Sequence, residues 1–184
     1  MRLFIGIPLA EQVKSELSAL CNKLRPGAPG LRWSRPESWH ITLQFLGSAG
    51  EEPLDCLRAR LAEVRAAPVP VRLGELGIFD RAGVFIVEVE LAPGLAALQK
   101  RIVAATAQCG FVAEERPYHP HITLARAKDE AGRRQLKKLK AGAPTRPVFS
   151  TFIANEFLLY ESHAEAGGSR YEVRARFAVG ERAS

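Results

Sequence analysis

The chain has 184 residues, 47% of them apolar and 25% charged, a composition that is typical of a folded globular protein and excludes disorder throughout. No stretch approaches the roughly 18 consecutive apolar residues of a membrane span, and the first residues lack a signal peptide's cleavage site. We therefore expect a cytoplasmic protein that does not bind a membrane, and its net charge of +6 favours anionic partners.

The apolar spacing of the first third of the chain predicts strands and helices in alternation. In chain order these are a strand at 2–8, a helix at 10–24, a strand at 39–46 and a helix at 53–64. Proline and glycine mark a loop at 25–30, and Pro53 takes a first-turn position that helices tolerate.

The remaining two thirds of the chain predict a similar order of elements. Strands at 69–79 and 84–91 form a hairpin, and a helix at 93–109 ends at Gly110. A strand at 119–126, a basic helix at 129–140 and strands at 148–160 and 171–179 follow. This order predicts an α+β fold in one two-lobed domain over residues 1–184, with mainly antiparallel sheets and outer helices.

The tetrapeptide His-Ile-Thr-Leu occurs twice and takes two of the four histidines, His40 and His121. At average residue frequencies, such a repeat arises by chance with a probability of about one in a thousand. Both copies fall on predicted strands, in which successive side chains point to opposite faces. We therefore expect His40 to share a face with Thr42, and His121 to share a face with Thr123, along a common cleft.

Two imidazoles in one cleft can act as general acid and general base, because a pKa of about 6.5 allows one neutral and one protonated ring. A phosphodiester needs this pair, since the neutral ring takes a proton from water and the protonated ring gives one to the departing oxygen. The hydroxyls of Thr42 and Thr123 can donate to the non-bridging oxygens. This chemistry requires no metal and no other cofactor.

The chain resembles the RNA 2′,3′-cyclic phosphodiesterase family, also called ThpR or LigT, within the two-histidine phosphoesterase superfamily. The resemblance rests on paired HxTx motifs in the segments RLFIGIPL, LRWSRPESWHITLQFLG and PYHPHITLAR, and it covers essentially the whole chain. It implies pseudo-symmetric lobes around a central cleft that carries the two HxTx strands. It also implies hydrolysis of RNA 2′,3′-cyclic phosphate ends to 2′-phosphomonoesters, with a reverse 2′,5′ RNA ligase activity.

The resemblance also implies residue roles. His40 takes the position of the proton donor and His121 that of the proton acceptor, while Thr42 and Thr123 bind the phosphate.

Two further residues match family positions but conflict with strict strand alternation. Arg126 matches an arginine that contacts the phosphate, although alternation alone places it on the face opposite His121. Phe45 matches an aromatic position near the nucleobase, but alternation points it toward the core, and we favour the core.

Three alternatives stay open. The protein could be a non-catalytic RNA-binding module, or a two-histidine phosphoesterase for other cyclic phosphates or 2′,5′-linked oligonucleotides. His119 and His121, together with His40, could instead bind zinc, although no acidic residue accompanies the motifs.

His163 is expected to be a solvated loop residue.

Eight basic and two acidic residues lie between Arg126 and Arg146, and they account for the whole net charge. Many of them fall on the predicted helix at 129–140, which is either an ordinary solvated surface or a track for RNA phosphates. We expect RNA with 2′,3′-cyclic phosphate ends as the partner, and a monomer.

The three cysteines are odd in number, far apart and in no CxxC pair, which argues against a disulfide framework and favours a reducing compartment. Cys21 and Cys109 each continue an apolar helical face, so we expect both to pack in the core.

Overall fold

The computed structural model describes residues 1–166 and 168–180. Its first sheet has the order β10-β9-β1-β3, and its second has the order β2-β7-β6-β5. The first sheet contains β1 (Arg2–Pro8), β3 (His40–Ser48), β9 (Glu156–Glu165) and β10 (Gly168–Ala178). The second contains β2 (Leu31–Trp33), β5 (Leu73–Phe79), β6 (Val84–Val89) and β7 (His121–Ala127). All pairings are antiparallel, which confirms the predicted α+β class.

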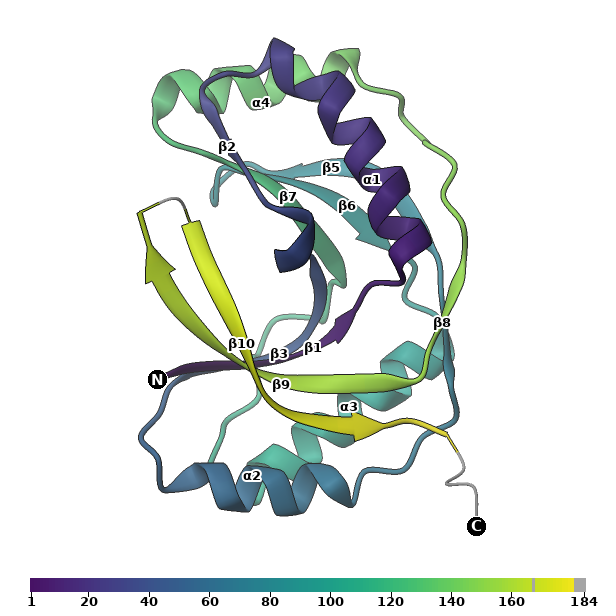
Figure 1. The fold of residues 1–184 in the computed structure, drawn as a ribbon, viewed down its shortest axis with the longest axis vertical. Coiled ribbons are helices and arrows are strands. Elements are labelled where there is room, and N and C mark those ends of the chain that lie inside the picture. Colours follow the sequence, from purple (N-terminus) through teal and green to yellow (C-terminus); the bar gives the residue numbers. More distant parts are fainter. Residues whose placement is uncertain (167, 181–184) are drawn as a thin grey trace.

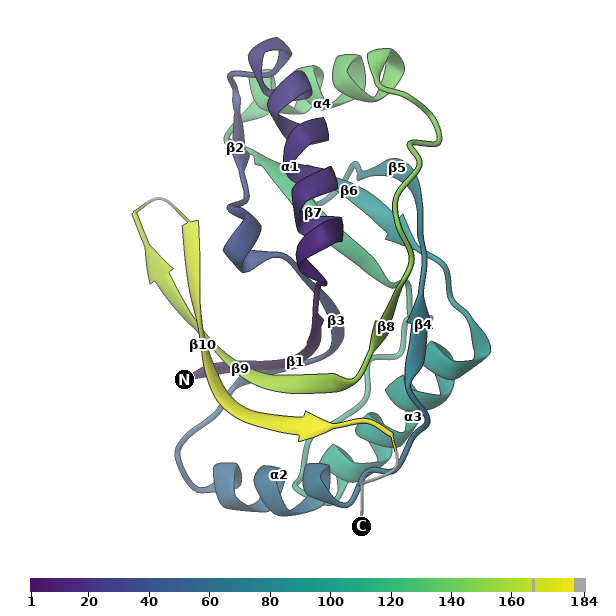
Figure 2. The ribbon, with the colours of Figure 1, turned by 45° about the vertical axis from the view of Figure 1, so that its right-hand side comes forward.

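Four helices cover the outer faces of the sheets, and a short ladder pairs β4 (Val69–Val71) with β8 (Phe152–Ala154) (Figure 1). The helices are α1 (Glu11–Leu24), α2 (Pro53–Ala62), α3 (Pro93–Ala107) and α4 (Glu130–Gly142). Figures 1 and 2 both show α1 beside α4 over the second sheet, whereas α3 packs on β3 of the first sheet.

The chain runs through the same series of elements twice. The first series is β1-α1-β3-α2-β4-β5, and the second is β6-α3-β7-α4-β8-β9, with β2 inserted in the first and β10 added after the second. Each series gives its last strand to the other sheet, because β5 pairs with β6 and β9 pairs with β1. The two histidine strands, β3 and β7, hold equivalent places in the two series.

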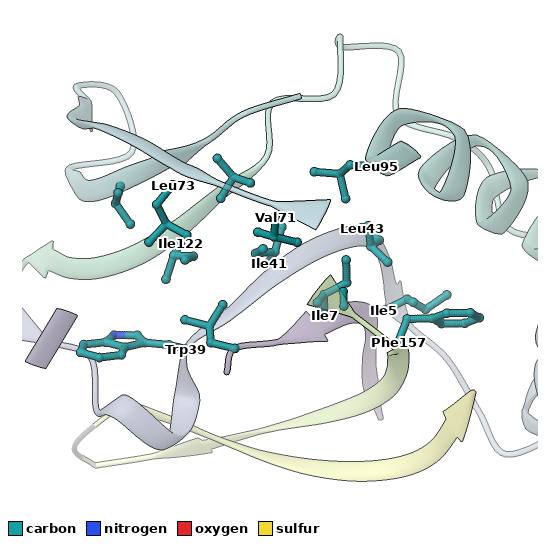
Figure 3. Packing of buried hydrophobic residues seen from close by; sticks show 14 of the residues in the cluster. Ile5, Ile7, Trp39, Ile41, Leu43, Val71, Leu73, Leu95, Ile122 and Phe157 are labelled. Atoms are coloured by element: carbon teal, nitrogen blue, oxygen red, sulfur yellow. The ribbon is translucent and has the colours of Figure 1, made fainter. Parts of the chain in front are cut away.

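Most of the buried apolar side chains form one core that both sheets share, and Phe4, Leu158 and Tyr160 form a second, small cluster. Figure 3 shows Ile41 and Leu43 of β3, Ile122 of β7 and Leu95 of α3 within the shared core, and all four are at most 2% exposed. Apolar burial of this kind is the main favourable term in folding. It also fixes the orientation of both histidine strands, since a strand that buries alternate residues presents the others on its opposite face.

Most predicted elements are confirmed to within about two residues, but some are not. The segment predicted as one strand at 69–79 forms two strands, and its first part, β4, pairs with β8 instead of joining the hairpin. Strand β2 was not predicted, because three residues are too few for a periodic pattern. His163 lies on β9, half-buried beside Glu161 and Glu172, so its assignment to a solvated loop was wrong.

The cysteine predictions were partly wrong, since Cys56 and Cys109 form a disulfide with Cα atoms 5.8 Å apart. The two cysteines meet because α2 packs against α3, a tertiary contact that cysteine spacing does not reveal. The reducing compartment therefore loses its support from the cysteines. Cys21 is buried on α1 as predicted, and burial raises the pKa of its thiol to about 12.

Within the described residues, no helix combines the length and the apolar character that crossing a membrane would need.

Candidate active site

The two HITL segments open β3 and β7 and have matching burial patterns. His40 and Thr42 are half-buried while Ile41 is buried, and His121, Ile122 and Thr123 repeat this pattern. Each histidine therefore shares a strand face with its threonine, as predicted.

Both histidine rings are held by the same backbone contact. His40 Nδ1 lies 2.8 Å from the carbonyl oxygen of Ser38, and His121 Nδ1 lies 2.8 Å from that of His119. A carbonyl oxygen only accepts hydrogen bonds, so in each ring Nδ1 carries the proton and donates it. Nε2 of each neutral ring is left with its lone pair, and in His40 it lies 3.1 Å from Thr42 Oγ1, which can donate to it.

His40 lies against aromatic side chains from three other strands. Its ring centroid is 4.6 Å from that of Phe4, 5.1 Å from that of Tyr171 and 5.8 Å from that of Tyr160. Gly6 of β1 makes room for the ring, because a Cβ there would lie 3.3 Å from His40 Cδ2. Burial lowers the pKa of His40 to about 4, and the nearby charges of His121 and Arg126 act in the same direction.

His121 has a less enclosed environment. Its ring meets Phe79 edge-on at a centroid distance of 4.8 Å, and the His119 ring lies 6.2 Å away. Burial again lowers the histidine pKa, helped by the charges of His119 and Arg126, while the hydrogen bond to the His119 carbonyl opposes this. Arg126 lines a pocket together with Ser38 and Tyr171, both of which contact His40, and its charge lowers the pKa of both histidines.

A β-bulge interrupts each histidine strand at the same position. Thr42 and Gln44 pair with adjacent residues of β1, so Leu43 is an extra residue. Thr123 and Ala125 pair with adjacent residues of β6, so Leu124 is the extra residue of β7. An extra residue shifts the alternation of side chains by one position beyond the bulge.

The two bulges explain why Phe45 and Arg126 differ from strict alternation. Phe45 is 57% exposed, with its ring 6.2 Å from that of Phe4, so the prediction that it lies in the core was wrong. Arg126 is exposed and lies on the same side of β7 as His121. The two residues follow their histidines by five positions, so they are equivalents in the two lobes.

Strands β3 and β7 are in contact, so the two HxTx motifs are neighbours, and the structure adds contacts that the sequence did not reveal. The ring of Phe4 stacks on Tyr160 at 4.8 Å, and the Tyr118 hydroxyl donates to the carbonyl of Thr42 over 2.9 Å. The aromatic residues around His40 come from β1, β9 and β10, and no local pattern joins such distant strands.

The basic helix lies away from the histidines. Leu136 and Leu139 of α4 pack in the core beneath the second sheet, on the side opposite His121 and Thr123. Arg133 donates to the carbonyl oxygen of Asp80, at the turn between β5 and β6. The use of this helix as an RNA track remains a prediction.

No group of three or more His, Cys, Asp or Glu side chains within residues 1–166 and 168–180 is arranged to hold a metal ion.

Residues 13–163 match the family described as the 2′-5′ RNA ligase superfamily. The RNA 2′,3′-cyclic phosphodiesterase of Bacillus subtilis is 35% identical over 67% of this chain and 69% of its own length. The protein of that name from Thermus thermophilus is 36% identical over 72% of each chain. The crystal structure of Escherichia coli LigT complexed with 3′-AMP has a TM-score of 0.82 at 27% identity, covering 98% of both chains.

Proposed function

Because the chain belongs to the 2′-5′ RNA ligase superfamily, we propose that it hydrolyses RNA 2′,3′-cyclic phosphate ends to 2′-phosphomonoesters by paired histidine catalysis. The observation that carries this proposal is the matched pair of rings. Each has its Nδ1 proton bound to a backbone carbonyl, so each keeps Nε2 for proton transfer. The names of the relatives support this substrate class.

In the proposed reaction, the phosphate lies between the two Nε2 atoms. His121 takes a proton from water as the water oxygen bonds to phosphorus. The bond from phosphorus to the 3′ oxygen breaks, and His40 gives that oxygen its proton. The phosphate stays on the 2′ oxygen, and each histidine ends in the other's starting protonation state, so a proton exchange with solvent restores the enzyme.

Arg126, Thr42 and Thr123 hold the phosphate in this scheme. Their donors bind its non-bridging oxygens, where charge must be stabilised through the transition state. Among the described residues, Arg126 has no carboxylate within 4.0 Å, so its charge is available to an anion. A phosphate between the rings also raises the pKa of both histidines, which allows His40 to carry the proton that it donates.

The reverse reaction requires no further group. When a 5′-hydroxyl occupies the place of water, His121 takes its proton as its oxygen bonds to phosphorus, and His40 protonates the departing 3′ oxygen. This joins the cyclic phosphate end to that hydroxyl through a 2′,5′ linkage, and it is the reverse of cleavage of such a linkage. The superfamily's name agrees with this second activity. We propose hydrolysis as the main activity, because water is always present in excess.

The test is to incubate the protein with a 2′,3′-cyclic mononucleotide and excess chelator and to follow phosphorus by NMR. The proposal expects consumption of the substrate and a single product, the 2′-monophosphate. No consumption with or without chelator favours the RNA-binding module or another phosphodiester substrate. Loss of activity only in chelator supports the zinc alternative, and a 3′-monophosphate reverses the roles of His40 and His121.

The monomeric state and the cytoplasmic location stay predictions. Sedimentation analysis tests the first. The second is in tension with the Cys56–Cys109 bond, because disulfides are rare in a reducing cytosol. Alkylating the protein at the moment of cell lysis and counting its blocked thiols decides whether that bond exists in the cell.

A further inference from the structure

Beside His40 lies a polar pocket, and Arg126 is the one side chain of its lining that the proposed chemistry uses. Its lining includes Arg32, Arg35, Ser38, Arg126, and Ser169 and Tyr171 of β10. These residues bring together β2, β7 and the β9–β10 hairpin, whose strands are labelled in Figure 1. We propose that this pocket binds the phosphodiester that joins the terminal nucleotide to its 5′ neighbour, so that RNA chains are preferred to mononucleotides. This inference rests on the proposed function.

The pocket is continuous with the catalytic site through three of its residues. The Ser38 carbonyl oxygen accepts a hydrogen bond from His40 Nδ1, and the Tyr171 ring meets the His40 ring edge-on at a centroid distance of 5.1 Å. Arg126 lowers the pKa of both histidines and also lines the pocket. A terminal phosphate held between the histidines therefore has the pocket directly beside it.

The charge of the pocket is positive and uncompensated. Arg32 pairs directly with Arg126 across β2 and β7, and two like charges at such a position destabilise a sheet. Within the described residues, none of Arg32, Arg35 and Arg126 has a carboxylate within 4.0 Å. An anion between them would relieve this repulsion, and guanidinium groups suit the oxygens of a phosphodiester.

Among the described residues that line the pocket, one is a carboxylate, Glu165, and it does not cancel the pocket's positive charge. Glu165 Oε1 accepts a hydrogen bond from Arg170 Nε over 2.9 Å, so its charge is already paired within the hairpin.

Strand β2 is held firmly enough to position Arg32. Gly30 N donates to Gln135 Oε1 of α4 over 2.7 Å, and Ser34 N donates to the Leu124 carbonyl over 2.8 Å. Gly132 allows this close approach, because a Cβ there would lie only 2.7 Å from the Gly30 oxygen. Helix α4 thus acts as a support for the pocket.

A mononucleotide and a short RNA differ in the group that this pocket would bind. A 2′,3′-cyclic mononucleotide with a free 5′-hydroxyl offers one phosphate, and the histidines hold it. A dinucleotide with the same cyclic end offers a second phosphate, one nucleotide toward the 5′ side. The proposal therefore predicts that Arg32 and Arg35 raise kcat/KM for the dinucleotide relative to kcat/KM for the mononucleotide.

The experiment measures kcat/KM for a cyclic mononucleotide and for a dinucleotide with a 2′,3′-cyclic phosphate end. Arg32→Gln should lower the ratio of dinucleotide to mononucleotide about tenfold, the effect of losing one hydrogen bond to a charged group. Arg35→Gln should lower the same ratio. Arg58→Gln, which removes the same charge from an exposed position on α2, is the matched control and should leave both constants unchanged.

A second dinucleotide, with an uncharged methylphosphonate linkage, tests the contact from the substrate side. The wild type should lose its preference for this dinucleotide, and Arg32→Gln should lose nothing further. Equal losses on mononucleotide and dinucleotide in Arg32→Gln, or an unchanged wild-type preference for the uncharged linkage, would overturn the proposal. Circular dichroism confirms that each variant is folded.

Failure of the proposed function gives a different result. In that case the wild type consumes neither substrate, and the pocket is tested by equilibrium binding of the two dinucleotides. Weaker binding of only the charged dinucleotide by Arg32→Gln supports the pocket, and equal binding by both proteins overturns it.

Discussion

Strands β3 and β7 carry the same tetrapeptide and the same bulge, but they place their histidines in different surroundings. His40 packs against three aromatic rings and has a pKa of about 4, whereas His121 meets one phenyl ring and the neighbouring His119. Five positions after the histidine, β3 has Phe45 and β7 has Arg126. The repeated sequence thus sets the geometry of the site, while residues from other strands make its two halves chemically different.

The largest expected effect comes from removing either histidine. His40→Ala and His121→Ala should each lower kcat for a 2′,3′-cyclic mononucleotide by about a hundredfold or more, as expected for the loss of a general acid or base. His119→Ala is the matched control, because it removes a nearby imidazole but keeps the carbonyl that holds His121. It should change kcat only a few-fold. Near-normal turnover in either motif variant would rule out the paired mechanism.

The two bulged positions should differ in the size of their effects. Arg126→Ala should lower kcat/KM by roughly 10-fold to 100-fold, because it removes a charged donor to the phosphate. Phe45→Ala should have a smaller effect and change KM more than kcat, since an exposed ring can stack on a base but cannot stabilise charge. Steady-state kinetics on one cyclic mononucleotide provide this comparison. An Arg126→Ala variant with normal kcat/KM would remove Arg126 from the site.

The pH dependence should distinguish the two rings. Both histidine pKa values lie below the ordinary 6.5 in the free enzyme. The pH dependence of kcat/KM should therefore be bell-shaped, with its maximum below pH 6.5. A bound phosphate raises both pKa values, so the bell for kcat should lie at higher pH. Histidine resonances in proton NMR should show His40 titrating near pH 4, and adding a nucleoside 2′-phosphate should move that titration upward. No upward movement would contradict the assignment of His40 as donor.

The lowered pKa of His40 also has a consequence for stability. The unfolded chain binds this proton near pH 6.5, whereas the folded chain binds it only near pH 4. Stability should therefore fall as the pH drops through this interval, because the unfolded state binds more protons there. Urea unfolding of the wild type and His40→Ala at pH 7 and pH 4.5 measures this, and the variant should show the smaller loss. Equal losses of stability in the two proteins would show that a group other than His40 takes up the proton in this interval.

The smallest expected effect is on the basic helix. Reversing the exposed charges Arg134 and Lys138 to Glu should weaken binding of a long RNA and make its salt dependence shallower, because fewer counterions are released. Turnover of a cyclic mononucleotide should stay within about twofold, since α4 lies on the far side of the second sheet. If the variant binds RNA at low salt as tightly as the wild type does, the helix is an ordinary solvated surface and not an RNA track.

The sequence was sufficient to predict the features that repeat or have a regular period. The helices, most strands and the shared faces of His40 with Thr42 and His121 with Thr123 follow from alternation and helical spacing. Phe45 was misplaced because an extra residue in a strand has no local signature when it is as apolar as its neighbours, as Leu43 is. The Cys56–Cys109 pair and the aromatic surroundings of His40 depend on which elements pack together in three dimensions.

The most direct test of the two histidine roles uses a cyclic substrate in which sulfur replaces the 3′ bridging oxygen. A thiolate leaves without a proton at neutral pH far more readily than an alkoxide, because thiols have a pKa of about 8.5. The account predicts that the hundredfold defect of His40→Ala shrinks to a few-fold on this substrate, while the defect of His121→Ala remains. If the defect of His121→Ala shrinks instead and that of His40→Ala remains, the two roles are exchanged. If each variant has the same defect on the sulfur substrate as on the oxygen substrate, neither histidine donates the proton to the leaving group.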